Sequence, residues 1–279
     1  MLIFGDGKRD TSIPFGIRYN INCFTMNFTS PFPKVEPVTF KFTFLREVGL
    51  EVTFKTAELT DDSKSEYWMR FKDFAKDKFK LDIPNEYRPG NSEIFSKDAE
   101  TKFVFNYEQG CVRLQMGSKR YVMFDTTLVE YLKIIILYLN DVVCVKDVNK
   151  LVLRKTNVFP FTSKGCSMKV KDILHATFKP EHAADFNKKK GGVGELVKEI
   201  KDIKVDLGED AALLLTLGYE VVDGENVNVL FNMCSEYEPK RHMAVDDVLE
   251  TAKALNDIMY DAFIYYISEQ VCAIMKKAN

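Results

Sequence analysis

The chain has 279 residues, of which 46% are hydrophobic and 29% are charged, and its formal net charge is −2. This composition is ordinary for a globular protein and is sufficient for one large domain or two modest ones. The near-neutral charge excludes a global field that would draw the chain to nucleic acid or to an anionic membrane, although it is compatible with a local basic patch. The six cysteines include no CxxC pair, which excludes a zinc spacing or a disulfide framework and favours reduced thiols.

The N-terminus and the apolar segments predict no membrane association. Charged residues begin at Asp6, which is too early for a signal peptide. The longest apolar run, residues 128–139, contains Glu130 and Lys133 and is too short to cross a bilayer. We therefore expect a cytoplasmic protein.

The first third of the chain predicts an extension, two strands and a helix. Residues 1–32 are rich in turn formers and aromatics and are interpreted as an N-terminal extension. Residues 39–44 alternate strictly between phenylalanine and polar residues, which predicts a strand. A second strand is expected at 50–56 after a turn at Gly49. Residues 63–79 carry aromatics near helical spacing and predict an amphipathic helix.

The middle of the chain predicts a meander followed by a helix. Residues 103–107, 112–116 and 120–124 alternate and are separated by turn signals, so we expect three short antiparallel strands. Thr127 and Glu130 then form a capping-box pattern. The apolar helix that follows should run to about residue 140 and be buried on two sides.

The last part of the chain again predicts strands followed by a helix. A strand at 150–159 should stop at Pro160, and a short helix is expected at 169–178. Strands at 211–222 and 226–234 flank a hairpin signal. Residues 245–277 repeat apolar side chains at steps of three and four, which predicts one long helix or two stacked helices.

This order of elements predicts an α+β fold with mainly antiparallel sheet, not a parallel doubly wound fold. Short meander strands should pack against a buried central helix and a long C-terminal helix. We place a first α+β unit at 33–160 and a second at 161–279, sharing one core. A hairpin followed by a helix occurs twice, although the two copies are too diverged to define a sequence repeat.

Three residues at the end of the strand expected at 150–159 are candidates for ligand binding: Arg154, Lys155 and Asn157. An arginine and an amide at a strand end can hold an anion. The structural alternative is that Arg154 pairs with a carboxylate on a neighbouring strand while Asn157 satisfies backbone groups near the turn.

A lysine run provides a second binding candidate. Lys188, Lys189 and Lys190 could contact phosphate groups. Acidic residues interleave with the lysines that follow, up to residue 206, and cancel most of the field. A flexible, solvated loop and a solvated face are therefore the default interpretation.

The sequence contains no recognisable catalytic, metal or cofactor motif. Residues 192–197 begin like a dinucleotide fingerprint but lack its third glycine. Cys166 has no histidine near it in sequence that could act as a base. The histidines follow no metal-ligand spacing: His175, His182 and His242. We therefore predict no catalytic residue, metal or cofactor.

Two segments carry a family resemblance. The first segment contains the alternating strands at 103–105 and 112–116, the helix that follows them and the strand 153–157. The second segment contains the helix at 255–263. Across 103–157 and 245–277 the chain resembles a sporadically distributed family of uncharacterised prokaryotic α+β proteins. Thr156 departs from the apolar residue usual in that family. The resemblance implies architecture and a prokaryotic or phage-borne origin, and it provides no catalytic residue to carry over.

The leading functional hypothesis is a non-enzymatic binding protein with a protein partner, such as an accessory of a prokaryotic defence or toxin–antitoxin system. One alternative is an enzyme with a dispersed polar site near Arg154 and Asn157, between the sheet and the last helix. Another is nucleic-acid binding, in which aromatics of a sheet face, from Phe40 to Phe44 or from Phe103 to Tyr107, stack on bases. The apolar stripe of the C-terminal helix also allows a homodimer.

Overall fold

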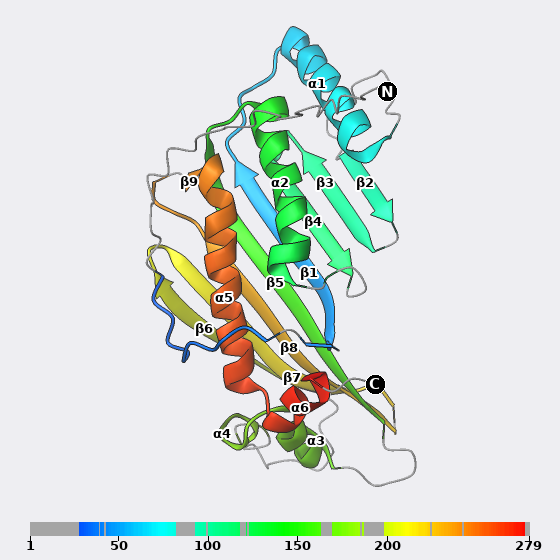
Figure 1. Cartoon of the computed structure of the whole chain (residues 1–279), viewed down its shortest axis with the longest axis vertical. Helices are drawn as coiled ribbons and strands as arrows, with labels where there is room; N and C mark the ends of the chain where they lie inside the picture. Colours follow the sequence, from blue (N-terminus) through cyan, green and yellow to red (C-terminus); the bar gives the residue numbers. More distant parts are fainter. Residues whose placement is uncertain are drawn as a thin grey trace, which may run out of the picture.

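The computed structural model describes residues 28–38, 40, 41, 43–81, 93–98, 100–117, 121, 123–162, 169–184, 186, 198–223, 225–241 and 243–276. Its strands pair in the order β2-β3-β4-β1-β5-β8-β7-β6, each neighbour antiparallel, and β9 pairs with the start of β5 (Figure 1). The predicted α+β fold with a long C-terminal helix is confirmed. The strands are β1 (Leu45–Phe54), β2 (Glu93–Asp98), β3 (Thr101–Asn106), β4 (Cys111–Gly117), β5 (Asp147–Thr162), β6 (Lys198–Gly208), β7 (Ala211–Val221), β8 (Asn226–Tyr237) and β9 (Met243–Ala244).

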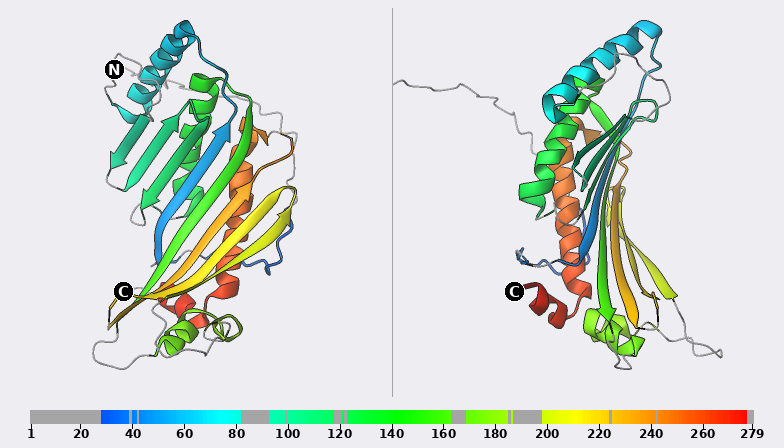
Figure 2. Two further views of the ribbon diagram at one scale, coloured as in Figure 1. Left: turned by 180° about the vertical axis from the view of Figure 1, so that it is seen from behind. Right: turned by 90° about the vertical axis from the view of Figure 1, so that its right-hand side faces the viewer.

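The long helices α2 and α5 lie side by side on one face of the sheet, and the described part of the chain places no helix on the other face (Figures 1 and 2). Helix α1 lies at the end of the sheet near β2 and β3, whereas α3, α4 and α6 gather at the opposite end. The helices are α1 (Asp61–Phe79), α2 (Val129–Leu137), α3 (Val170–Thr177), α4 (Pro180–Ala183), α5 (Val248–Tyr266) and α6 (Glu269–Lys276). Single turns of other helix types flank α2 and precede α5: η1 (Phe124–Leu128), η2 (Tyr138–Val143) and η3 (Val245–Asp247).

The topology repeats itself. Strand β1, helix α1, the meander β2-β3-β4 and helix α2 form one half, and β5, α3 with α4, the meander β6-β7-β8 and α5 form the other. In each half the last meander strand pairs with the first strand, and β1 and β5 join the halves at the centre of the sheet. The hairpin-and-helix pattern seen twice in the sequence is thus part of a larger duplicated arrangement. The predicted boundary at residue 160 falls inside β5.

Helix α5 packs on its own sheet. Its apolar stripe includes Leu255, Met259 and Ala262, which are fully buried, and the Phe263 ring stacks on Phe231 of β8 at 5.8 Å between centroids. Its exposed residues are charged: Glu250, Lys253 and Asp257. The stripe that would allow a homodimer through the C-terminal helix is therefore occupied within the chain.

The described residues of segment 28–44, here called the N-terminal strap, cross the outer side of α5 before entering β1 (Figure 1). The backbone N–H of Val35 donates to the Asp261 carboxylate at 3.0 Å, and that of Val38 donates to the Tyr260 hydroxyl at 2.9 Å. The strand expected at 39–44 is wrong for residues 40, 41, 43 and 44, because their phenylalanines pack instead: Phe40 on Tyr260 and Phe44 on Phe159. Thr39 and Phe42 lie outside the described residues.

Two residues at which the sequence predicted the end of a strand, Gly49 and Pro160, lie inside continuous strands. Gly49 does not turn the chain but lies inside β1, between Gln115 and Arg154 on the adjacent strands. Pro160 lies inside β5, paired with Asn228 of β8. It is tolerated there because β1 begins at Leu45, opposite Asn157, so beyond that point β5 has a strand neighbour on one side only.

The central helix begins earlier than the capping box predicts. Helical structure starts at Phe124, so Thr127 lies within the first turn instead of before it, and neither η1 nor α2 has a side-chain cap. The third meander strand expected at 120–124 is wrong for the described residues Tyr121, Met123 and Phe124. The third strand of the meander is β2, which precedes β3 and which the sequence reading did not predict.

Gly110 holds the turn between β3 and β4 against β1. It has a φ of +58°, and a Cβ at this position would lie 2.2 Å from the carbonyl oxygen of Phe54. We predict that Gly110→Ala lowers the free energy of unfolding by about 2 kcal/mol or more, measured by urea denaturation. Gly49→Ala is the matched control: its Cβ would meet Arg154 at an ordinary 3.6 Å, so little change is expected. Equal effects of the two substitutions would contradict this account.

Candidate functional site

The face of the sheet opposite α2 and α5 is here called the open face. Its side chains alternate with buried ones along each strand, because successive residues of a strand point to opposite sides. It carries cations and anions in equal number, and none of its described side chains is aromatic. Its residues are Glu47, Glu51, Thr53, Lys102, Val104, Arg113, Gln115, Lys150, Val152, Arg154, Thr156, Val158, Lys198, Ile200, Asp202, Lys204, Asp206, Ala212, Leu214, Thr216, Gly218, Glu220, Asn228, Leu230, Asn232, Cys234 and Glu236.

Arg154 belongs to a charged cluster at the centre of the open face. The Glu51 carboxylate accepts a hydrogen bond from Arg113 Nε at 2.9 Å and lies 3.6 Å from Arg154 Nη1. The hydrogen bond with Glu51 raises the pKa of Arg113. Arg154 thus pairs with a carboxylate on a neighbouring strand, as the structural alternative predicted. Because both arginines share one carboxylate, the cluster keeps a local positive excess.

Asn157 lies on the opposite face from Arg154. It is buried, and its side-chain amide donates to the backbone carbonyl of Phe231 in β8 at 3.0 Å. Residues 154 and 157 differ by an odd number along one strand, so they cannot share a side of the sheet. The structure therefore does not bring together the arginine and the amide that were expected to hold an anion.

Lys155 is also on the helix-covered face, beneath α5. Its Nζ donates to the Asn256 side-chain oxygen at 2.7 Å and lies 5.5 Å from the centre of the Tyr121 ring. Burial lowers the pKa of Lys155 to about 8, although the nearby Asp257 carboxylate opposes the shift. Burial likewise raises the pKa of Tyr121, to a value far from neutral. Sequence reasoning missed Asn256, a polar residue directly beside the apolar position Leu255 in a helix that packs on the sheet.

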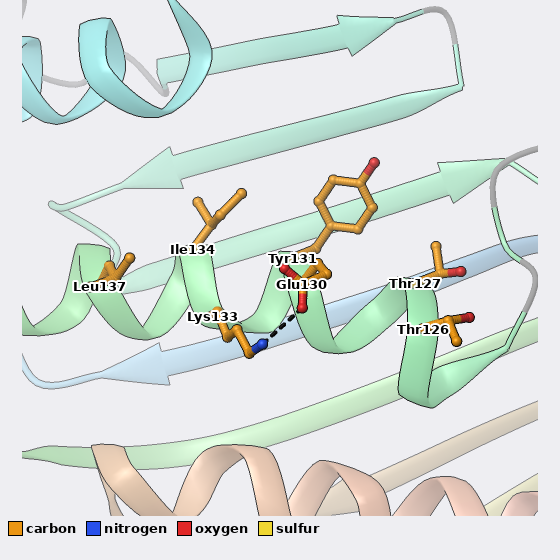
Figure 3. A pocket seen from close by; sticks show the side chains of 7 residues that line it. All are labelled: Thr126, Thr127, Glu130, Tyr131, Lys133, Ile134 and Leu137. Carbon is orange, nitrogen blue, oxygen red and sulfur yellow. Dashed lines mark hydrogen bonds and ion pairs between the residues drawn. The ribbon is translucent and has the colours of Figure 1, made fainter. Parts of the chain in front are cut away.

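The cavities along η1 and α2 and beside Tyr266, in the part of the chain that the structure describes, lie away from these residues. A cavity of about 430 Å³ lies along η1 and α2, lined by Thr126, Thr127, Glu130, Tyr131, Lys133, Ile134 and Leu137 (Figure 3). Within it Lys133 pairs with Glu130 at 2.7 Å, so its charges cancel each other. Neither Arg154, Lys155 nor Asn157 lines this cavity.

The other sequence candidates are either separated or outside the described residues. Lys188, Lys189, Lys190, Cys166 and His242 lie outside them. Among the residues that the structure does describe, no group of three or more His, Cys, Asp and Glu side chains is placed to hold a metal ion. None of the described helices combines the length and apolarity needed to cross a membrane.

Comparison with known proteins does not assign this chain to a family. No model of a protein family matches the sequence, and no curated protein matches it significantly. The resemblance to uncharacterised prokaryotic proteins, inferred from the motifs in 103–157 and 245–277, stays a prediction.

The buried amine of Lys155 makes a pH-dependent prediction. Its folded pKa is lowered, so between pH 8 and 10.5 the unfolded chain holds a proton that the folded chain lacks, and rising pH favours the folded state. Below pH 8 both states are protonated and the penalty is fully present. Relative to Lys155→Met, wild type should gain on the order of 3 kcal/mol across this window.

The measurement is chemical denaturation of both proteins from pH 7 to 10.5. Lys253→Met, which removes a half-exposed lysine from α5, the helix that covers Lys155, is the control for loss of a surface charge. A difference between wild type and Lys155→Met that does not change with pH would show that the Lys155 amine is not protonated differently in the two states.

Proposed function

We propose that this chain is a non-enzymatic module that binds another protein through the open face of its sheet. A sheet face without a covering layer is ordinary in antiparallel proteins, so its exposure alone does not indicate binding. The proposal is supported by the composition of the part built from β5, β8, β7 and β6. There, aliphatic side chains form a row, with a glycine at one position, between rows of mainly polar side chains.

The aliphatic row crosses four neighbouring strands. Val158 of β5 pairs with Leu230 of β8, which pairs with Gly218 of β7, which in turn pairs with Ile200 of β6. Ile200 leans over Gly218, since a Cβ on that glycine would lie 3.1 Å from the isoleucine side chain. Ile200 is 43% exposed, and Leu214 on β7 is 40% exposed. Exposed aliphatic surface rimmed by polar groups is typical of protein contacts.

The same features disfavour nucleic acid as the partner. The aromatics considered for base stacking lie in 40–44 and 103–107. Phe103 and Phe105 are fully buried on the helix-covered face. The half-buried rings pack within the chain: Phe40 on Tyr260, Phe44 on Phe159 and Tyr107 on Tyr67. The open face has no described aromatic side chain to replace them, and its cations are matched by anions. Stacking platforms and a net positive groove are what single-stranded nucleic acids require. A protein surface of mixed charge with an aliphatic centre is the better complement.

An enzymatic function has one observation in its favour, which is the Lys155 amine with its pKa near 8. A lysine of this kind can act as a nucleophile. Here, however, the amine is hydrogen-bonded to Asn256 under α5, and the described cavity along α2 does not include it. We therefore place the enzyme second. The family resemblance supports a prokaryotic accessory role, such as defence or a toxin–antitoxin system, as part of this proposal.

The proposal predicts that partner capture depends on the aliphatic side chains of the open face, both in the row and at Leu214 beside it. The tagged full chain should retain a specific protein from its native lysate, and the double variant Leu214→Lys with Leu230→Lys should lose it, because two lysines disrupt apolar contact in the centre of the face. Met69→Lys is the matched control, since Met69 is 56% exposed but lies on α1, away from this face. Quantitative mass spectrometry of the three eluates is the measurement.

Equal recovery by the wild type and the double variant would reject the open face as the binding surface. Recovery of nucleic acid that is lost with increasing salt would instead support the nucleic-acid alternative. Circular dichroism of each variant should show an unchanged fold, which separates loss of binding from loss of structure.

A further inference from the structure

Strand β6 is an edge of the sheet, and its 11 residues pair with β7 alone. Every second residue of such a strand directs its N–H and C=O groups away from the sheet, where another strand can bind them. The N-terminal strap uses one of these groups: the Thr29 N–H donates to the Leu207 carbonyl at 2.7 Å. Apart from this contact, no backbone hydrogen bond to the outer side of β6 comes from the described residues.

The side chains of β6 make the strand complementary to itself. Lysine and aspartate alternate along its open face at Lys198, Asp202, Lys204 and Asp206, with Ile200 between them. On its other face the half-buried Ile203 packs beside Leu217. When two copies of such a strand run antiparallel, opposite charges can face each other across the pair.

We propose that β6 pairs antiparallel with β6 of a second copy of this chain, centred on Ile203. This register places Asp202 of each copy opposite Lys204 of the other, and it brings the two Ile203 side chains together. Thr29 occupies the edge at Leu207, so a pair centred on Ile203 can extend over residues 200–206 of each copy. The second copy thus meets edge backbone groups to which no backbone group of the described residues is hydrogen-bonded, together with two opposite-charge pairs and an apolar centre.

Neighbouring registers are less favourable. Centring the pair on Lys204 puts two lysines opposite each other and sets Asp202 against Asp206, and centring it on Asp202 opposes two aspartates. Like charges directly opposite one another destabilise a strand pair. Registers centred on Ile200 or Val205 also match charges, but they run past Lys198 or into the contact of Leu207 with Thr29.

The alternative role of the same charges is protection. Lysines and aspartates on an edge strand hinder pairing with unrelated chains, and natural sheets use them for this purpose. If the charges of β6 were only protective, they would not need to form opposite-charge pairs with a second copy in the register centred on Ile203. Charge reversal distinguishes the two roles, because it preserves protection while it breaks or restores self-complementarity.

The test is sedimentation equilibrium of the full chain at low salt, which does not depend on the proposed protein partner. Wild type should be a dimer. Lys204→Asp puts aspartate opposite aspartate in both symmetric positions and should weaken self-association by about tenfold or more. The double variant Asp202→Lys with Lys204→Asp exchanges the two charges and should restore the dimer. Asp202→Lys alone should fail in the same way as Lys204→Asp.

A monomeric wild type at the highest soluble concentration would overturn the proposal. So would a dimer that both single variants leave unchanged, because its interface would then lie elsewhere. Both charged residues are exposed, and Asp202 keeps its hydrogen bond from Thr216 in the Lys204→Asp variant, so the fold should tolerate the substitution. Melting temperatures of the four proteins check this directly.

Discussion

The antiparallel pairing of β1 with β5 is the contact on which the rest of the structure depends. Leu50 and Leu153 lie opposite each other at the centre of this pair, and both are essentially buried. Each half of the chain contributes one central strand and one meander, so without this pairing each half would expose a long sheet edge. Joining the halves here also places α2 and α5 side by side, which covers one face and leaves the other free.

The period of two along each strand explains both what the sequence predicted and where it failed. Alternation identified β3 and β4, because one face of these strands is buried and the other is not. The strands β7 and β8 were predicted instead from the hairpin signal between them. The same rule separates Arg154 from Asn157, a consequence that can be derived from their numbers before any coordinates are known. Partners from distant strands and helices, such as Glu51 for Arg154 and Asn256 for Lys155, leave no local signal.

The other wrong predictions of secondary structure were caused by tertiary contacts. Alternating phenylalanines at 40 and 44 indicate a strand, yet the segment crosses α5, because the backbone groups of Val35 and Val38 find acceptors on that helix. Strand β6 was not predicted, because its many charges are typical of a solvated segment. In the fold these charges belong to an edge strand, in which only some of the alternate positions are apolar. Local propensity is overridden in both segments by contacts that arise from the fold.

Strand pairing across β6 would also alter the proposed binding surface. An antiparallel pair continues the sheet, and its two-fold axis runs perpendicular to it, so the open faces of both copies would lie on the same side. In the register centred on Ile203, Ile200 lies opposite Asp206 of the other copy, so the two aliphatic rows would lie on the same side of one continuous sheet, displaced from each other along the strands. A partner with two matching segments would gain affinity from binding both rows at once, with no further contact within either copy. Duplication within the chain and pairing between chains would thus serve one purpose, which is to widen a face that a single half-sheet leaves too narrow.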